Sequence, residues 1–138
     1  MNIFEKKDFP VNSSSLKDIR EFSRSVINNS SILASNKDEL VLAIGEAAQN
    51  IVKHAYGDKR DTTDTMLIQI SFIDKKLEIG FFDKGKPIVK ENIKHRSLDD
   101  IKPGGLGTYF IKQIMDEVVF KDAKGWNNNL VLTKKYWT

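Results

Sequence analysis

Residues 39–57 read ELVLAIGEAAQNIVKHAYG and predict a strong helix. The segment is rich in leucine and alanine, which favour helix formation, and Gly57 follows it as the expected C-terminal stop. Small apolar residues recur along the segment at helical spacing. We therefore expect this helix to be a core element, against which the rest of the chain packs.

The segments on either side predict the remaining elements. We expect a strand at 2–9, a helix at 16–27 after three serines, a hairpin of strands 66–73 and 76–82, a helix at 108–116, and strands at 117–120 and 129–133. The polar stretch 28–31 predicts a helix end or a loop. Because strands and helices do not alternate regularly, the order favours an α+β fold. We expect a two-layer α/β sandwich, in which a mixed, mostly antiparallel sheet carries helices on one face.

Length and composition restrict the class of protein. A chain of 138 residues fits one domain spanning 1–138, and 22 Lys+Arg against 19 Asp+Glu leave a net charge of +3 with the signs interspersed. Cysteine is absent, which excludes disulfides, thiolate metal sites and thiol nucleophiles. Apolar runs fall short of the roughly 18 residues that a membrane span needs. The sequence predicts a soluble, cytoplasmic protein with no membrane and no direct nucleic-acid partner.

The first motif that could carry chemistry is Glu46 with Asn50 on the long helix. The two residues are four positions apart, so they lie about one turn apart on one face. A carboxylate can accept a proton from a hydroxyl, and an amide oxygen can ligate Mg²⁺. Lys53 returns to the same face and could meet a phosphate. Taken alone, the pattern favours an ordinary amphipathic helix with a solvated polar stripe.

The second motif is FFDKGKPI at residues 81–88. Asp83 ends a predicted strand, where its carboxylate can accept a hydrogen bond from an exocyclic amine such as that of adenine. Gly85 allows the backbone to approach a planar ligand closely. In isolation the same residues also fit a simple turn after a strand.

The third motif is KPGGLGTYF at residues 102–110. Its glycines precede a predicted helix, so free backbone N–H groups at the helix N-terminus could hold a phosphate. The motif lacks the Gly-Lys-Ser/Thr of a Walker A loop. A glycine-rich helix start without a ligand is the alternative. The polar segment 83–105 ahead of this helix predicts a functional loop or lid.

Taken together and in this order, the motifs resemble the GHKL ATP-binding superfamily. EAAQNIVKHAY at 46–56 is similar to its N box, DKGKP at 83–87 to its first glycine box, and GGLGTYFIKQIMDEV at 104–118 to its second. Within the superfamily, the chain most closely resembles the bacterial anti-sigma factor/serine-protein kinase family. The HAY at 54–56 and the MDEV at 115–118 are particular to that family.

The resemblance implies a role for each motif residue. Glu46 matches the proposed general base, and Asn50 matches the Mg²⁺ ligand that couples the metal to the phosphates of ATP. Asp83 matches the carboxylate that binds adenine, and Gly85 matches its close-approach glycine. Residues 88–103 match the ATP lid. Gly105 and Gly107 match the glycines nearest the phosphates, and our predicted nucleotide-binding set also includes Lys53, Gly104 and Thr108.

The function that the resemblance implies is an ATP-dependent serine/threonine protein kinase that acts as an anti-sigma factor. Such a protein uses ATP and Mg²⁺ to phosphorylate an anti-sigma factor antagonist, it sequesters a sigma factor, and the family suggests a homodimer. The catalytic domain of a histidine kinase is less favoured, because the residues ahead of the long helix contain no histidine to accept a phosphate.

Two departures from the family keep an alternative function open. Lys102-Pro103 stands where some relatives carry an arginine, so a cation aimed at the γ-phosphate would come from Lys102, Arg96 or Lys53. Asn128-Asn129 stands where the last strand of relatives usually begins with Gly-Thr. The alternative is a non-catalytic, nucleotide-gated protein-binding module of the same fold.

Overall fold

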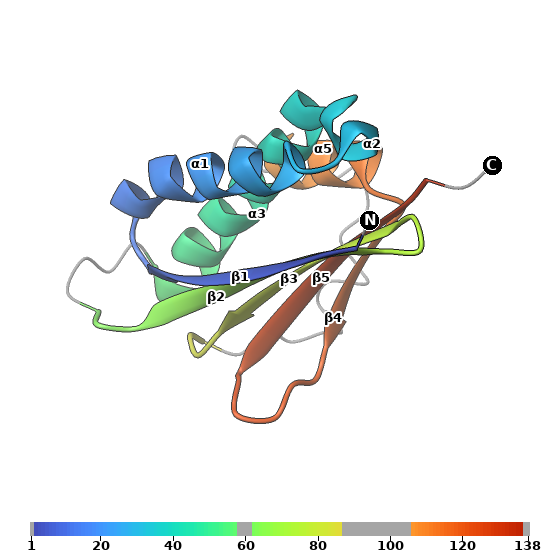
Figure 1. Ribbon diagram of the computed structural model, residues 1–138. Coiled ribbons are helices and arrows are strands. Elements are labelled where there is room, and N and C mark those ends of the chain that lie inside the picture. Colours follow the sequence, from blue (N-terminus) through green and yellow to red (C-terminus); the bar gives the residue numbers. More distant parts are fainter. Residues whose placement is uncertain (1, 58–61, 87–105, 137–138) are drawn as a thin grey trace.

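The fold is a two-layer α+β sandwich. We describe it from a computed structural model, in which residues 2–57, 62–86 and 106–136 are described. Five strands form one sheet, and the helices cover one of its faces (Figure 1). The predicted fold class is therefore confirmed.

The order of the elements along the chain follows the prediction closely. The strands are β1 (Ile3–Pro10), β2 (Thr65–Ile73), β3 (Lys76–Asp83), β4 (Glu117–Lys121) and β5 (Asn128–Lys135). The helices are α1 (Leu16–Ile27), α2 (Ser31–Ala34), α3 (Lys37–Tyr56) and α5 (Leu106–Ile114), and a 3-10 turn at Ser13–Ser15 precedes α1. None of these helices, within the described residues, is long and apolar enough to cross a membrane.

The short helix α2 is the element that the sequence pattern missed. The stretch 28–31 predicts a loop or a helix end, but Ser31 already begins α2. Ser30 caps this helix, since its hydroxyl oxygen accepts a hydrogen bond from the Leu33 N–H at 3.3 Å. Leu33 is fully buried and anchors α2 to the core. A helix of one turn is too short to show an amphipathic period.

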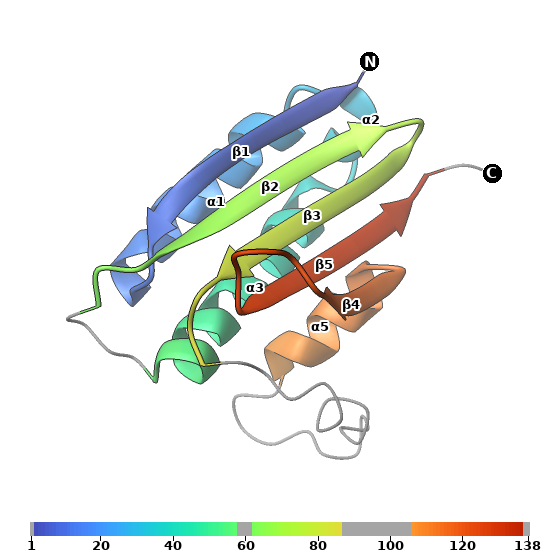
Figure 2. The ribbon, with the colours of Figure 1, turned by 90° about the horizontal axis from the view of Figure 1, so that it is seen from below.

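The sheet has the strand order β1-β2-β3-β5-β4, and all four pairings between these strands are antiparallel. Figure 2 shows β3 in the middle and β1 at one edge. On the helix-covered face, alternate strand residues such as Ile70, Ile79 and Phe81 are fully buried. The central place of β3 brings its last residue, Asp83, to one end of the sheet, opposite the first residue of β5, Asn128.

Helix α3 lies between α1 and α5 above the sheet (Figure 2). Apart from Tyr56 at its end, its buried residues are small or aliphatic, which lets neighbouring helices approach closely; they include Leu40, Ala43, Ile44, Ala47 and Ala48. Gly57 ends the helix as predicted. Its φ of 57° is left-handed, and its N–H donates to the Lys53 carbonyl at 3.1 Å.

The predicted hairpin between β2 and β3 turns at Asp74 and Lys75. Both residues have positive φ values, 52° and 61°, and the flanking residues Ile73 and Lys76 pair directly. Two consecutive positive φ values define a type I′ turn, which matches the right-handed twist of the strands. Lysine is strained in this conformation, whereas glycine adopts it freely.

The strain at Lys75 leads to a stability prediction. We expect Lys75→Gly to raise the free energy of unfolding by about 1 kcal/mol, because it removes the penalty of a left-handed lysine. Lys76→Gly is the matched control, since the same change one residue later falls in β3 and should lower that free energy by about 0.5–1 kcal/mol. Urea unfolding followed by circular dichroism measures both values, and a loss of stability in Lys75→Gly would contradict the turn assignment.

Candidate functional site

Asp83 is a buried carboxylate at the end of β3. Its side chain is 1% exposed. Its Oδ1 atom accepts hydrogen bonds from the Gly85 N–H and from the Asn128 side-chain nitrogen, each at 2.9 Å. The bond from Gly85 closes a tight turn directly after the strand.

Asp83 combines burial with specific hydrogen bonds. Burial raises the pKa of its carboxyl above the ordinary value, and the hydrogen bonds from Asn128 and Gly85 act in the opposite direction. A carboxylate that is desolvated and yet held by specific donors is common at functional sites. It offers a strong acceptor to a ligand N–H group.

Tyr56, the last residue of α3, ties that helix to the same end of the sheet. Its hydroxyl donates to Asp64 Oδ2 at 3.1 Å and accepts from the Lys84 N–H at 3.3 Å. Burial, followed by the hydrogen bond to Asp64, raises the pKa of Tyr56, so the hydroxyl stays protonated at neutral pH. This bridge fixes the end of α3 against the residue that follows Asp83.

Asn50 connects α3 to the helix that follows the second glycine motif. Its side-chain nitrogen donates to the Thr108 hydroxyl on α5 at 3.3 Å. Two predicted residues from different motifs, 58 positions apart, are thereby brought together. Glu46 lies one turn earlier on α3 and is half-buried, and Lys53 is exposed near the end of the helix.

The rest of the predicted phosphate-binding set is only partly described. Gly107 lies in the first turn of α5. Gly104, Gly105 and the predicted lid at 88–103 fall outside the described residues, as do Arg96 and Lys102, the two cation candidates other than Lys53.

The residues present fit a magnesium–nucleotide complex better than a protein-only metal site. Within the described segments, no three His, Asp or Glu side chains gather as a metal cluster. The bond to Thr108 uses the nitrogen of the Asn50 amide and not its oxygen, which is the atom that could ligate a cation. Mg²⁺ commonly takes one or two protein oxygens and completes its shell with phosphates and water.

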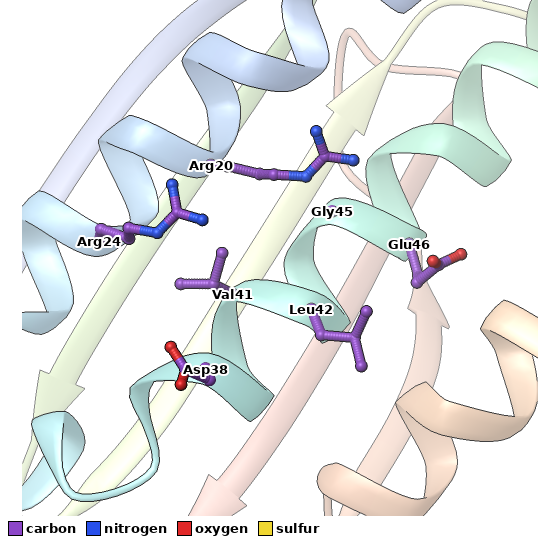
Figure 3. A pocket seen from close by; sticks show the side chains of 7 residues that line it. All are labelled: Arg20, Arg24, Asp38, Val41, Leu42, Gly45 and Glu46. Carbon is purple, nitrogen blue, oxygen red and sulfur yellow. The ribbon is translucent and has the colours of Figure 1, made fainter.

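A pocket of about 230 Å³ opens between α1 and α3 beside Glu46 (Figure 3). It is lined by Arg20, Arg24, Asp38, Val41, Leu42, Gly45 and Glu46. Arg20 reaches from α1 toward Gly45, where a Cβ atom would lie 3.4 Å from its Nε (Figure 3). Among the described residues, neither arginine forms an ion pair with Asp38 or Glu46. The lining of the pocket therefore holds two arginines and two carboxylates that are close to one another without forming ion pairs.

Sequence reasoning missed part of this arrangement. Arg20 and Arg24 lie four residues apart on α1. The signal that could have indicated a close approach of α1 to α3 is Gly45, a glycine in the middle of a strong helix. The sequence marks Asn128 only as a departure from the family pattern and does not indicate its hydrogen bond to Asp83.

Comparison with known proteins defines the class of this chain. A family model, the histidine kinase-like ATPase domain, matches residues 9–134, and the chain belongs to this family. The chain is also similar to serine-protein kinase RsbW of Staphylococcus aureus. It is 32% identical over 95 residues to the protein of strain bovine RF122 / ET3-1, and 32% identical over 97 residues to that of strain JH9. Each match covers 62% of this chain and 59% of the relative, so less than two thirds of each relative's length is matched. The predicted resemblance to GHKL ATPases and serine-protein kinases is confirmed.

The raised pKa of Asp83 leads to a pH-dependent stability prediction. In the unfolded chain this carboxyl ionises near pH 4, whereas the folded protein holds its proton to higher pH, so folding loses stability as pH rises through that window. Asp83→Asn removes this titration. We expect the variant to gain melting temperature relative to wild type at about pH 7.5, and the gain to shrink toward about pH 4.

Asp8→Asn, on an exposed site of the edge strand β1, is the matched control. Differential scanning fluorimetry across this pH range gives the melting temperatures of all three proteins. A gain for Asp83→Asn that stays constant or grows toward low pH would contradict the proposed cost of burying this carboxylate.

Proposed function

We propose that this chain is an ATP-dependent serine/threonine protein kinase that acts as an anti-sigma factor. It phosphorylates an antagonist protein in the cytoplasm and sequesters a sigma factor. The observation that carries the proposal is the contact between Asn50 and Thr108, which joins the first and third motifs, while the second motif holds the buried Asp83. Similarity to proteins named serine-protein kinase supports protein phosphorylation over other uses of ATP.

Each end of the proposed site has its own task. Asp83 accepts a hydrogen bond from the adenine amine, and Gly85 lets the base approach the backbone. The N-terminus of α5, with Gly104, Gly105, Gly107 and Thr108, receives the phosphates, together with Lys53. Asn50 holds Mg²⁺ by its amide oxygen. When bound, the metal neutralises phosphate charge, and phosphoryl transfer depends mainly on such positioning and neutralisation.

Glu46 is the proposed general base. It lies one helical turn before Asn50, on the side of α3 that also faces the pocket between α1 and α3. A carboxylate there would accept the proton of the serine hydroxyl that attacks the γ-phosphate.

The pocket also supports a protein as the substrate. A serine that reaches Glu46 must be carried by a partner that covers this part of the helical layer. Arg20 and Arg24 offer positive charges beside Glu46 that acidic side chains around the partner's serine could meet. The sigma factor and the homodimer suggested by the resemblance stay predictions.

A second candidate function is a nucleotide-gated binding module without catalysis. The departures that favour it are Lys102-Pro103 in place of an arginine and Asn128-Asn129 in place of Gly-Thr, and Asn128 bonds directly to Asp83. In this case Glu46 would have no role in proton transfer.

A substitution of Glu46 separates the two functions. We expect Glu46→Gln to lower the rate of antagonist phosphorylation by about 10²–10⁴-fold, because the amide cannot accept the serine proton, while Mg·ATP affinity stays near that of wild type. The measurement is transfer of labelled phosphate from ATP to candidate antagonists from the same genome. Glu39→Gln, on an exposed site in the first turn of α3, is the matched control.

Two outcomes would count against the proposal. If Glu46→Gln phosphorylates the antagonist as fast as wild type, the base is assigned wrongly. If wild type binds Mg·ATP and transfers phosphate to no candidate, the gated module is the better account.

A further inference from the structure

Asn128 faces Asp83 directly across the β3–β5 ladder. The two residues are register partners, and their side chains are 6% and 1% exposed. Paired residues of antiparallel strands point to the same face of a sheet, so the ladder itself sets their side chains next to each other. The pairing joins two positions that are 45 residues apart.

The Asn128 side chain bridges the carboxylate and the segment that follows β3. Its Nδ2 atom donates to Asp83 Oδ1 at 2.9 Å and to the Lys86 carbonyl at 3.0 Å. An amide nitrogen carries two hydrogens, so both are used by these bonds. The carboxylate and the backbone of Lys86 are thereby held at fixed places relative to β5.

The two oxygens of Asp83 differ as a result. Oδ1 receives two donors, from Asn128 and from Gly85. No hydrogen bond to Oδ2 occurs among the described residues. Rotating the carboxyl group would break both bonds to Oδ1, so Oδ2 keeps a single orientation and is the acceptor left for a ligand.

We propose that Asn128 is a positioning residue for nucleotide selection, which holds Asp83 so that Oδ2 accepts a hydrogen bond from the exocyclic amine of adenine. The inference rests on the proposed ATP site and assigns its base selectivity to a residue outside the motifs. A base with a carbonyl oxygen in place of that amine, as in inosine, would set a second acceptor against Oδ2.

The same bond controls the pH range in which Asp83 accepts. Burial raises the pKa of Asp83 and the bond from Asn128 lowers it, so loss of Asn128 raises it further. The titratable groups that also face Asp83 are Asp64, ahead of β2, which raises its pKa, and Tyr56 at the end of α3. A protonated carboxyl is a hydrogen-bond donor and no longer accepts the hydrogen bond of the adenine amine. As the pH is lowered, ATP affinity should therefore begin to fall at a higher pH in a variant lacking Asn128 than in wild type.

Asn127 offers a matched control one residue away. Its Nδ2 atom donates to the carbonyls of Lys84 and Gly85 at 2.9 and 3.2 Å, and it does not bond the Asp83 side chain. Asn127→Ala therefore removes anchoring of the segment after β3 and leaves the carboxylate with both donors.

The test measures affinities for Mg·ATP and for magnesium inosine triphosphate by isothermal titration calorimetry, from about pH 5.5 to about pH 8. We expect wild type to prefer ATP. Asn128→Ala should weaken ATP binding about tenfold at neutral pH and leave inosine triphosphate binding unchanged, because one bond to a charged acceptor is lost. The ATP deficit should widen as pH falls, and Asn127→Ala should keep the wild-type ratio.

An equal loss for both nucleotides in Asn128→Ala, or an unchanged ratio, would overturn the inference. If the alanine variant does not fold, Asn128→Leu carries the same test. Leucine has nearly the size of asparagine and no donor, so the ratio should still fall, and a wild-type ratio would overturn the inference. Two other results would contradict the proposed function instead. If wild type does not distinguish ATP from inosine triphosphate, or if Asp83→Asn keeps the preference for ATP, then Asp83 does not bind the adenine amine.

Discussion

The buried carboxylate of Asp83 is the constraint around which this end of the molecule is organised. A charge taken out of water is costly unless donors replace the solvent, and two donors converge on Oδ1. One comes from the tight turn at Gly85 and the other from Asn128 on the neighbouring strand. The bond from Asn128 depends on the β3–β5 register, since a shift by one residue would turn Asn128 to the other face. We infer that the free-energy cost of burying this carboxylate is retained because the carboxylate serves to bind a ligand.

Helix α3 carries the second half of the site and is positioned by packing. Its small buried residues let it lie close to α1, α5 and the sheet, and Tyr56 fastens its last turn to the residue after Asp83. Glu46 and Asn50 therefore project from a rigid element rather than from a loop. Such support is what a site needs to hold catalytic groups in register with a nucleotide.

The features that sequence alone predicts are those with a local physical signal. Three predicted features depend only on residues close together in the sequence, and all three are present. They are the helical periodicity of α3, the two-residue turn at Asp74-Lys75 and the glycine after Tyr56. Contacts between distant segments have no such signal, because they depend on strand register and helix packing. The bond from Asn128 to Asp83 and the approach of Arg20 to Gly45 are of this kind.

We propose that adenine binds at the end of β3 while the metal and phosphates bind between α3 and α5. A crystal structure of the protein with Mg²⁺ and a non-hydrolysable ATP analogue would test this arrangement. We expect the adenine amine within hydrogen-bonding distance of Asp83 Oδ2, and the metal on the Asn50 amide oxygen. A nucleotide bound elsewhere, or a base whose amine does not meet Asp83, would contradict it.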